Sequence, residues 1–96
     1  MKMIFLSYNV CLHEEILEKL EQAGIEGYTC FSKVLGKGKS SGSHLDNTIW
    51  PGANSALLVA VEEDKTQEIL QAIRSLRKTA SLQGIKAFVW SLDEIS

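Results

Sequence analysis

The most informative stretch of the chain reads Gly24-Ile-Glu-Gly-Tyr-Thr-Cys-Phe-Ser-Lys-Val-Leu-Gly-Lys-Gly-Lys-Ser-Ser-Gly42. Its first residues end a helical pattern, its middle is rich in β-forming residues, and its last third is a loop of glycines and lysines. Glycines flanked by lysines place backbone amides and ammonium groups around an anion, which is the requirement for holding phosphate. Because such spacing is also common in plain turns, a phosphate loop and a mobile hairpin connection both stay open.

The residues before this stretch predict a strand followed by a helix. Residues 2–8 form a short apolar run that is typical of a strand. A helical pattern then continues to Gly24, with Asn9 as the expected N-terminal cap and the glycine as the end of the helix. The expected buried residues of this helix are Leu12, Ile16, Leu20 and Ala23, with Leu17 beside them.

The residues after the stretch predict the remaining elements. Residues 28–35, 53–61 and 85–92 are β-rich and predict three further strands. Between the last two strands a second helix is expected to begin at the cap Asp64, because Gln67 stands at the spacing of a capping box. The expected buried stripe of this helix is Ile69, Ile73, Leu76 and Ala80.

This element order predicts an α+β fold, the ferredoxin-like βαββαβ sandwich, in which two helices cover one face of an antiparallel sheet. Residues 1–96 are expected to form a single domain, since a chain of this length buries one core. The runs Met3–Leu6 and Leu57–Val61 are apolar on both faces, which a sheet covered on one side does not require. We therefore expect a homo-oligomer in which further copies cover the second face.

Charge and hydropathy exclude several classes of protein. The net charge of −2 removes the usual electrostatic basis for binding nucleic acid. No apolar run approaches the roughly 20 residues that cross a bilayer, and the first residues lack a signal-peptide pattern, so we expect a cytoplasmic protein that does not span a membrane. In that compartment Cys11 and Cys30 are expected to be reduced and buried.

The loop after residue 39 carries candidate partner and metal residues, namely His44, Leu45, Asp46 and Trp50. If Trp50 is exposed, it favours contact with a partner protein, because aromatic residues anchor interfaces. The alternative is that Trp50 folds back and covers the base of the loop. His44 and Asp46 are two residues apart, so in an extended segment their side chains point the same way and could share a cation. Two ligands from one chain are too few for a metal site, and the alternative is that His44 is simply solvated. No enzyme activity is expected, since the serines of this loop lie too close in sequence to His44 and Asp46 for triad geometry.

Several runs of the chain resemble the nitrogen-regulatory PII family of signal proteins. They are Leu12–Thr29, Gly36-Lys-Gly-Lys39, Val61–Leu70 and Lys86-Ala-Phe-Val89, and together they cover nearly the whole chain. The resemblance implies a homotrimer of ferredoxin-like subunits whose loop between the second and third strands regulates enzymes or membrane transporters. It also implies adenine nucleotides such as ATP or ADP in the clefts between subunits.

The resemblance also implies which residues hold the nucleotide. Thr29 falls where the adenine is contacted, and Lys86 falls at the position of a phosphate-binding lysine. The residues expected near the phosphates in the glycine and lysine loop are Gly36, Lys37, Gly38 and Lys39. The turn at residues 79–86 keeps one glycine and no acid of the family's turn, and the sequence stops at Ser96, before the position of the family's arginine-bearing tail. A weakened nucleotide site, another small anion and no nucleotide therefore stay open.

The functional hypothesis is a PII-like signal-transduction regulator. A trimer would sense a small effector at its subunit clefts and control a partner enzyme or membrane transporter through residues 37–54. The alternative is a metal-binding trimer of the copper-tolerance type, which has the same subunit topology but no long regulatory loop. The segment Gly36–Lys39 and the long loop after it favour the signalling family.

Overall fold

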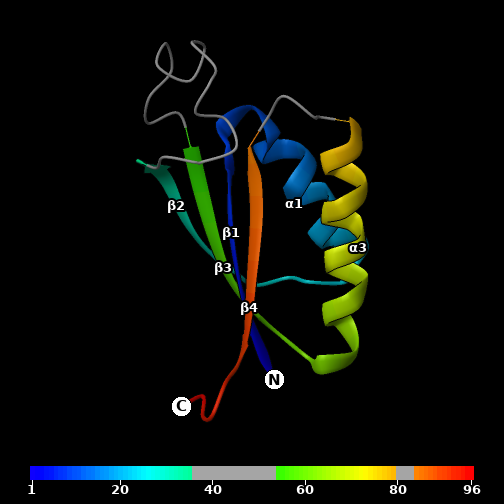
Figure 1. The fold of residues 1–96 in the computed structure, drawn as a ribbon. Helices are drawn as coiled ribbons and strands as arrows, with labels where there is room; N and C mark the ends of the chain where they lie inside the picture. The colour runs from blue at the N-terminus through cyan, green and yellow to red at the C-terminus, as the bar shows by residue number, and fades with distance from the viewer. Residues whose placement is uncertain (36–53, 80–83) are drawn as a thin grey trace.

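The computed structural model describes residues 1–35, 54–79 and 84–96. The elements along these residues are β1 (Lys2–Asn9), the short 3-10 turn η1 (Val10–Leu12), α1 (His13–Gln22), β2 (Thr29–Val34), β3 (Asn54–Val61), α3 (Glu63–Thr79) and β4 (Ile85–Ser91). The described strands form one antiparallel sheet in the order β2-β3-β1-β4. Both helices lie on the same side of this sheet (Figure 1). The predicted ferredoxin-like sandwich is thereby confirmed.

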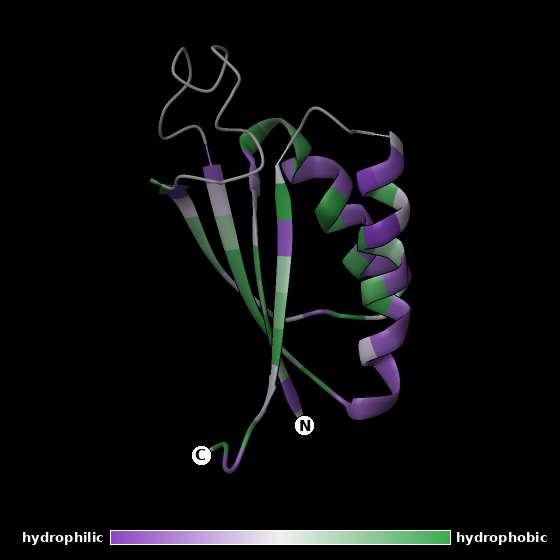
Figure 2. Cartoon of the chain, in the orientation of Figure 1, coloured by the Kyte–Doolittle hydropathy of each residue, from purple (hydrophilic) through white to green (hydrophobic). Residues whose placement is uncertain are grey.

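The core lies between the sheet and the helices. Alternate residues of β1 point toward the helices, and Ile4, for example, pairs with Val59 on one side and Val89 on the other. Figure 2 shows that hydrophobic residues run along the strands, whereas each helix carries hydrophobic and hydrophilic residues together. The predicted helix residues that are buried are Leu12, Ile16, Leu20, Ala23, Ile69, Ile73 and Leu76. Ala80 lies outside the described residues.

Asn9, the expected cap of the first helix, caps the turn η1 instead, and Leu12 precedes α1 without a side-chain capping bond, whereas Gly24 ends α1. The Asn9 side chain accepts a hydrogen bond from the backbone N–H of Cys11 at 2.9 Å, which caps the turn that leads into the helix. At the other end Gly24 adopts φ +80°, and its N–H donates to the carbonyl of Glu21 at 2.9 Å. The N–H of Ile25 then donates to the carbonyl of Leu20, which completes a Schellman motif. Gly24 therefore ends the helix, as predicted.

The predicted start of the second helix is wrong by two residues, because a cap at Asp64 would start the helix at Lys65. α3 begins at Glu63, so Asp64 lies in its first turn and is not the cap. The carbonyl of Glu62 accepts a hydrogen bond from the N–H of Lys65 at 3.0 Å and another from the Thr66 hydroxyl at 3.4 Å. The backbone of Glu62 thus opens the helix, and the acidic first turn still complements the positive end of the helix dipole.

The face of the sheet that points away from the helices is apolar and uncovered in the single chain. We call it the open face. Its large side chains are Met3, Phe5, Phe31, Leu58, Phe88 and Trp90, from all strands of the described sheet. Phe88 is 53% exposed and Trp90 is 47% exposed, although both belong to residue types that favour interiors. The sheet is therefore apolar on both faces, as the sequence indicated.

The cysteines contradict their predicted burial, because Cys11 and Cys30 are both exposed. Cys30 lies on β2, an edge strand on which five of six residues are exposed, so its neighbours cover it on one side only. Cys11 lies in the turn η1 at the surface end of β1. Their burial was inferred from composition, which does not distinguish an edge strand from a central one.

Within the described residues, neither α1 nor α3 combines the length and the apolar character that a bilayer crossing requires.

Candidate functional site

Two of the residues that the resemblance picked out lie on the open face. Thr29, at the start of β2, pairs with Leu58 of β3, and this row continues through Phe5 to Phe88. Lys86, in β4, occupies the next row on the same face, where it pairs with Ser7. Both side chains are exposed. A ligand that approaches the open face or its edges can therefore reach either residue.

The single chain does not bring Thr29 and Lys86 together. β2 and β4 are the opposite edges of the sheet, and three strand spacings of about 4.8 Å separate them, or about 14 Å in all. Large side chains of the open face, among them Phe5 and Leu58, stand between the two edges. Thr29 and Lys86 instead lie at the two opposite edges of the sheet, and a second copy of the chain can approach either edge with its own opposite edge.

The remaining candidates lie outside the described residues. They are the loop residues Gly36, Lys37, Gly38, Lys39, His44, Leu45, Asp46 and Trp50. The strand residues on either side of this loop are described, because Val34 of β2 pairs with Asn54 of β3. Ser55 next to this pair is buried, and its hydroxyl donates to the carbonyl of Ser32 at 3.0 Å. The base of the loop is thus tied to the sheet at the edge that carries Thr29.

Arg77 is a residue near the candidate site that the sequence reasoning missed. Its Nη2 atom donates to the carbonyl oxygen of Ile85 at 3.3 Å, immediately before Lys86. A signal was present in the sequence, since Arg77 and Lys78 end the helix that leads directly into the last strand. Arg77 therefore reaches the first residues of β4 from the helix side of the sheet, whereas Lys86 lies on the open face.

Tyr8 and His13 lie at the same end of the molecule, where β1 leads into α1. The Tyr8 Oη atom lies 2.6 Å from Nδ1 of His13, and the two rings stack at a centroid distance of 5.9 Å. Burial raises the pKa of the Tyr8 phenol above its ordinary value, and the nearby Cys30 and Tyr28 add to this rise. The phenol therefore stays protonated at neutral pH and fixes the start of α1 against β1.

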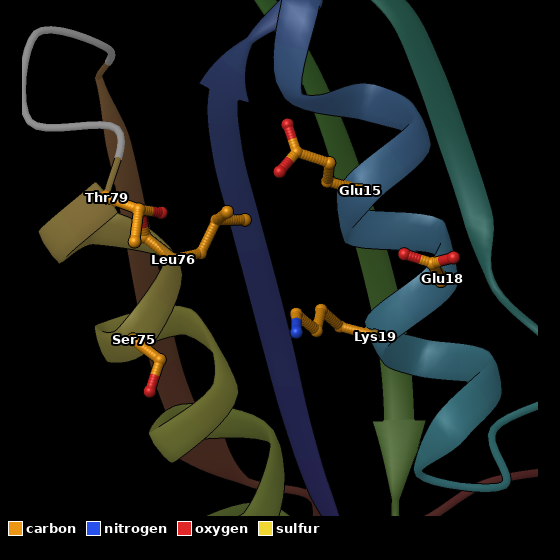
Figure 3. A pocket seen from close by; sticks show the side chains of 6 residues that line it. All are labelled: Glu15, Glu18, Lys19, Ser75, Leu76 and Thr79. Atoms are coloured by element: carbon orange, nitrogen blue, oxygen red, sulfur yellow. The ribbon is translucent and has the colours of Figure 1, made fainter.

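A groove of about 200 Å³ lies between the helices, on the far side of the sheet from the open face. It is lined by Glu15, Glu18, Lys19, Ser75, Leu76 and Thr79. Figure 3 shows that the side chains come from facing turns of α1 and α3, with Lys19 extending toward α3. The groove contains neither Thr29 nor Lys86, so it is separate from the candidate site.

Comparison with known proteins identifies the family of the chain. The sequence profile of the family described as "Nitrogen regulatory protein P-II" matches residues 1–96. The chain belongs to the P-II family. P-II proteins are regulatory proteins rather than enzymes, and the match favours the signalling family over the copper-tolerance alternative.

Individual relatives agree with this assignment. The P-II relative "Nitrogen fixation nifHD region glnB-like protein 1" of Methanococcus maripaludis is 28% identical over 95 residues, which cover 98% of this chain and 90% of that protein. A solved structure of a PII-like signaling protein from Thermus thermophilus has a TM-score of 0.65 and 25% identity, with 93% of this chain and 83% of that chain covered. The two P-II relatives thus match nearly all of the chain in sequence or in fold.

A further P-II neighbour is CPII of Thiomonas intermedia K12, a nitrogen regulatory PII-like protein that was solved bound to ADP, AMP and bicarbonate. It has a TM-score of 0.70 and 19% identity, with 99% of this chain and 94% of that chain covered. At this identity the likeness concerns the fold alone. The ligands named are those of CPII.

Within residues 1–35, 54–79 and 84–96, no group of three or more His, Cys, Asp or Glu side chains is placed to hold one ion. The candidate ligands His44 and Asp46 lie outside the described part of the chain.

Proposed function

We propose that this P-II chain is the subunit of a cytoplasmic homotrimer, one domain per chain, that binds an adenine nucleotide between subunits and signals to a partner protein. The observation that carries the proposal is the position of Thr29 and Lys86 on opposite edges of one apolar face. A second copy that packs on this face buries its aromatic side chains and brings the two edges of neighbouring chains together. The same contact between two chains would then form both the oligomer and the nucleotide-binding cleft.

The chemistry of the two edges supports a nucleotide as the effector. A phosphate group accepts charge-assisted hydrogen bonds from an ammonium group such as that of Lys86, and the Thr29 hydroxyl can donate to or accept from a base. The fold neighbour CPII was solved with ADP and AMP, which makes adenine nucleotides the first ligands to test. Nucleotide at the loop base would then favour one conformation of residues 37–54, and that conformation would select the partner enzyme or transporter.

Calorimetry on the full chain tests the nucleotide proposal. ATP, ADP and AMP are titrated into the wild type, into Lys86→Gln and into Lys19→Gln, which removes the same charge from the interhelical groove. We expect Lys86→Gln to weaken ATP binding by about tenfold or more, because a charge-assisted hydrogen bond is lost, while Lys19→Gln stays within about twofold. The absence of any heat of binding when the wild type is titrated with all three nucleotides at millimolar concentration would contradict the nucleotide proposal.

Deletion of residues 40–50 tests the role of the loop separately. We expect the deletion variant to keep its oligomeric mass and its nucleotide affinity within about threefold, since the deletion spares the strands and Lys86. Binding to the regulated partner, once that partner is known, should be lost. Unchanged partner binding by the deletion variant would show that the loop does not carry the signal.

A further inference from the structure

The side chain of Arg77 reaches from the last turn of α3 to the beginning of β4. Its Nη2 atom donates to the carbonyl oxygen of Ile85 at 3.3 Å. This contact joins the helix to the strand across the connection between them, whose described ends are Thr79 and Gly84. The guanidinium is therefore held at the first residue of β4.

The hydrogen bonds of β4 show where this guanidinium lies. The N–H of Asn9 donates to the carbonyl of Gly84 at 2.9 Å, so that carbonyl points toward β1. Carbonyl directions alternate along a strand, and the carbonyl of Ile85 consequently points away from β1. β4 has no neighbouring strand on that side in the described sheet. Arg77 thus occupies the free edge of β4.

Arg77 and Lys86 flank the same short length of this edge. The guanidinium contacts the backbone of Ile85, and the Cα atom of Lys86 follows that of Ile85 by about 3.8 Å. Among the described residues the ion pairs are Lys2 with Glu63 and Lys65 with Glu68, so no described carboxylate pairs with either cation. A guanidinium has five N–H donors, and the bond to Ile85 leaves others for a ligand.

We propose that Arg77 is a second phosphate-binding cation of the nucleotide site and makes the site selective for nucleoside di- and triphosphates over monophosphates. The inference rests on the proposed function, and it names a residue and a specificity within that site. Lys86 and Arg77 stand at the edge that would meet Thr29 of a neighbouring chain. Two cations at one end of a cleft, of which Arg77 is held by its bond to Ile85, favour a ligand in proportion to its phosphate charge.

The test is calorimetry of AMP, ADP and ATP binding to the full chain, compared for wild type, Arg77→Gln, Arg77→Lys and Lys78→Gln. Lys78→Gln is the matched control, because it removes one positive charge from the same helix turn at an exposed position. We expect Arg77→Gln to weaken ATP binding by about tenfold or more and AMP binding by less than about threefold. Arg77→Lys should lie between wild type and Arg77→Gln, and Lys78→Gln should stay within about threefold for each nucleotide.

Other outcomes separate this inference from the proposal on which it rests. Equal ATP affinity in wild type and Arg77→Gln would overturn the role of Arg77 while leaving a nucleotide-binding protein. Equal losses for AMP and ATP would also overturn it, because they indicate that Arg77 only holds the start of β4. A wild type that binds no nucleotide would overturn both proposals. The urea midpoint of Arg77→Gln checks folding, and Arg77→Lys provides the second variant should that midpoint fall.

Discussion

At the scale of single residues, Tyr8 joins the sheet to the first helix. It is buried at the end of β1, and its hydroxyl lies 2.6 Å from Nδ1 of His13 at the start of α1. Burial, together with Cys30 and Tyr28, raises the pKa of its phenol. The folded chain therefore holds the phenolic proton more tightly than the unfolded chain does.

Because folding and the binding of this proton are linked, the effect of Tyr8→Phe on the free energy of unfolding should depend on pH. At pH 7 the variant should lose about 1 kcal/mol of unfolding free energy, because the hydrogen bond to His13 is missing. Above about pH 10, the ordinary tyrosine pKa, the unfolded wild type loses the Tyr8 proton while the folded form retains it, so the stability of the wild type falls. Urea denaturation between pH 7 and pH 11 should show the difference between wild type and variant shrinking. A difference that grows with pH would contradict the assigned direction.

The sequence predicted individual residues well where helical spacing alone decides burial. Leu12, Ile16 and Leu20 recur at that spacing and are buried in the structure. Cys30 was predicted wrongly, because its exposure depends on β2 being an edge strand, and strand order is set by pairing far along the chain. Arg77 was missed for a related reason, since its partner is the backbone carbonyl of Ile85 in the next element.

At the scale of elements, the end of α1 depends on one glycine. Gly24 has φ +80°, and the nearest atom that an added Cβ would meet is Lys65 Nζ at 3.8 Å. Space is therefore available, and the cost of a side chain comes from the backbone conformation alone. The Schellman motif fixes this conformation, because it requires a left-handed residue after the helix.

Gly24→Ala should consequently lower the free energy of unfolding by about 1 kcal/mol, with little change in the core. Gly27→Ala is the control, since it adds the same methyl group where no atom lies within 4 Å and φ is not left-handed. We expect the control to stay within about 0.5 kcal/mol of the wild type in urea denaturation. Equal effects of the two substitutions would show that the left-handed conformation does not limit stability.

The order and type of the described elements followed from the sequence, because each helix and strand has its own periodicity. The start of α3 did not, since Asp64 and Gln67 have the spacing of a capping box but lie inside the helix. The carbonyl of Glu62 opens the helix through bonds to Lys65 and Thr66. Several acidic residues in a row leave the cap position open in sequence, and backbone hydrogen bonds then decide it.

At the scale of the whole molecule, the open face explains why the chain should assemble. Phe5 and Phe88 contact each other there with ring centroids 6.3 Å apart, and Phe88 and Trp90 remain about half exposed. Burying exposed aromatic side chains against a second surface removes them from water and makes the free energy of association more favourable. We therefore expect the open face to be the contact between chains.

Phe88→Lys should separate the chains without unfolding them, because Phe88 contributes little to the core of its own chain. Gln67→Lys adds the same charge at an exposed position on α3 and should leave the assembly intact. Light scattering at micromolar concentration is expected to give the monomer mass for Phe88→Lys and the oligomer mass for Gln67→Lys, with a folded circular dichroism spectrum for both. An unchanged oligomer mass for Phe88→Lys would place the contact elsewhere.

The candidate site could be predicted only in part from sequence. Thr29 and Lys86 were picked out by family resemblance, and the structure adds that they share the open face at opposite edges. Their separation follows from the strand order β2-β3-β1-β4, which no local pattern contains. Because of that separation, we propose a nucleotide site that is completed only when chains assemble.

Native mass spectrometry of the full chain in the presence of ATP tests for such a shared site, because it counts chains and nucleotides in the same particle. We expect trimers that carry up to one nucleotide per chain, together with any remaining monomers that carry none. The absence of ATP from monomers would follow from the position of Thr29 and Lys86 at opposite edges of one sheet, with large apolar side chains of the open face between them. Monomers that bind ATP one to one, or a protein that stays monomeric at micromolar concentration, would contradict the account.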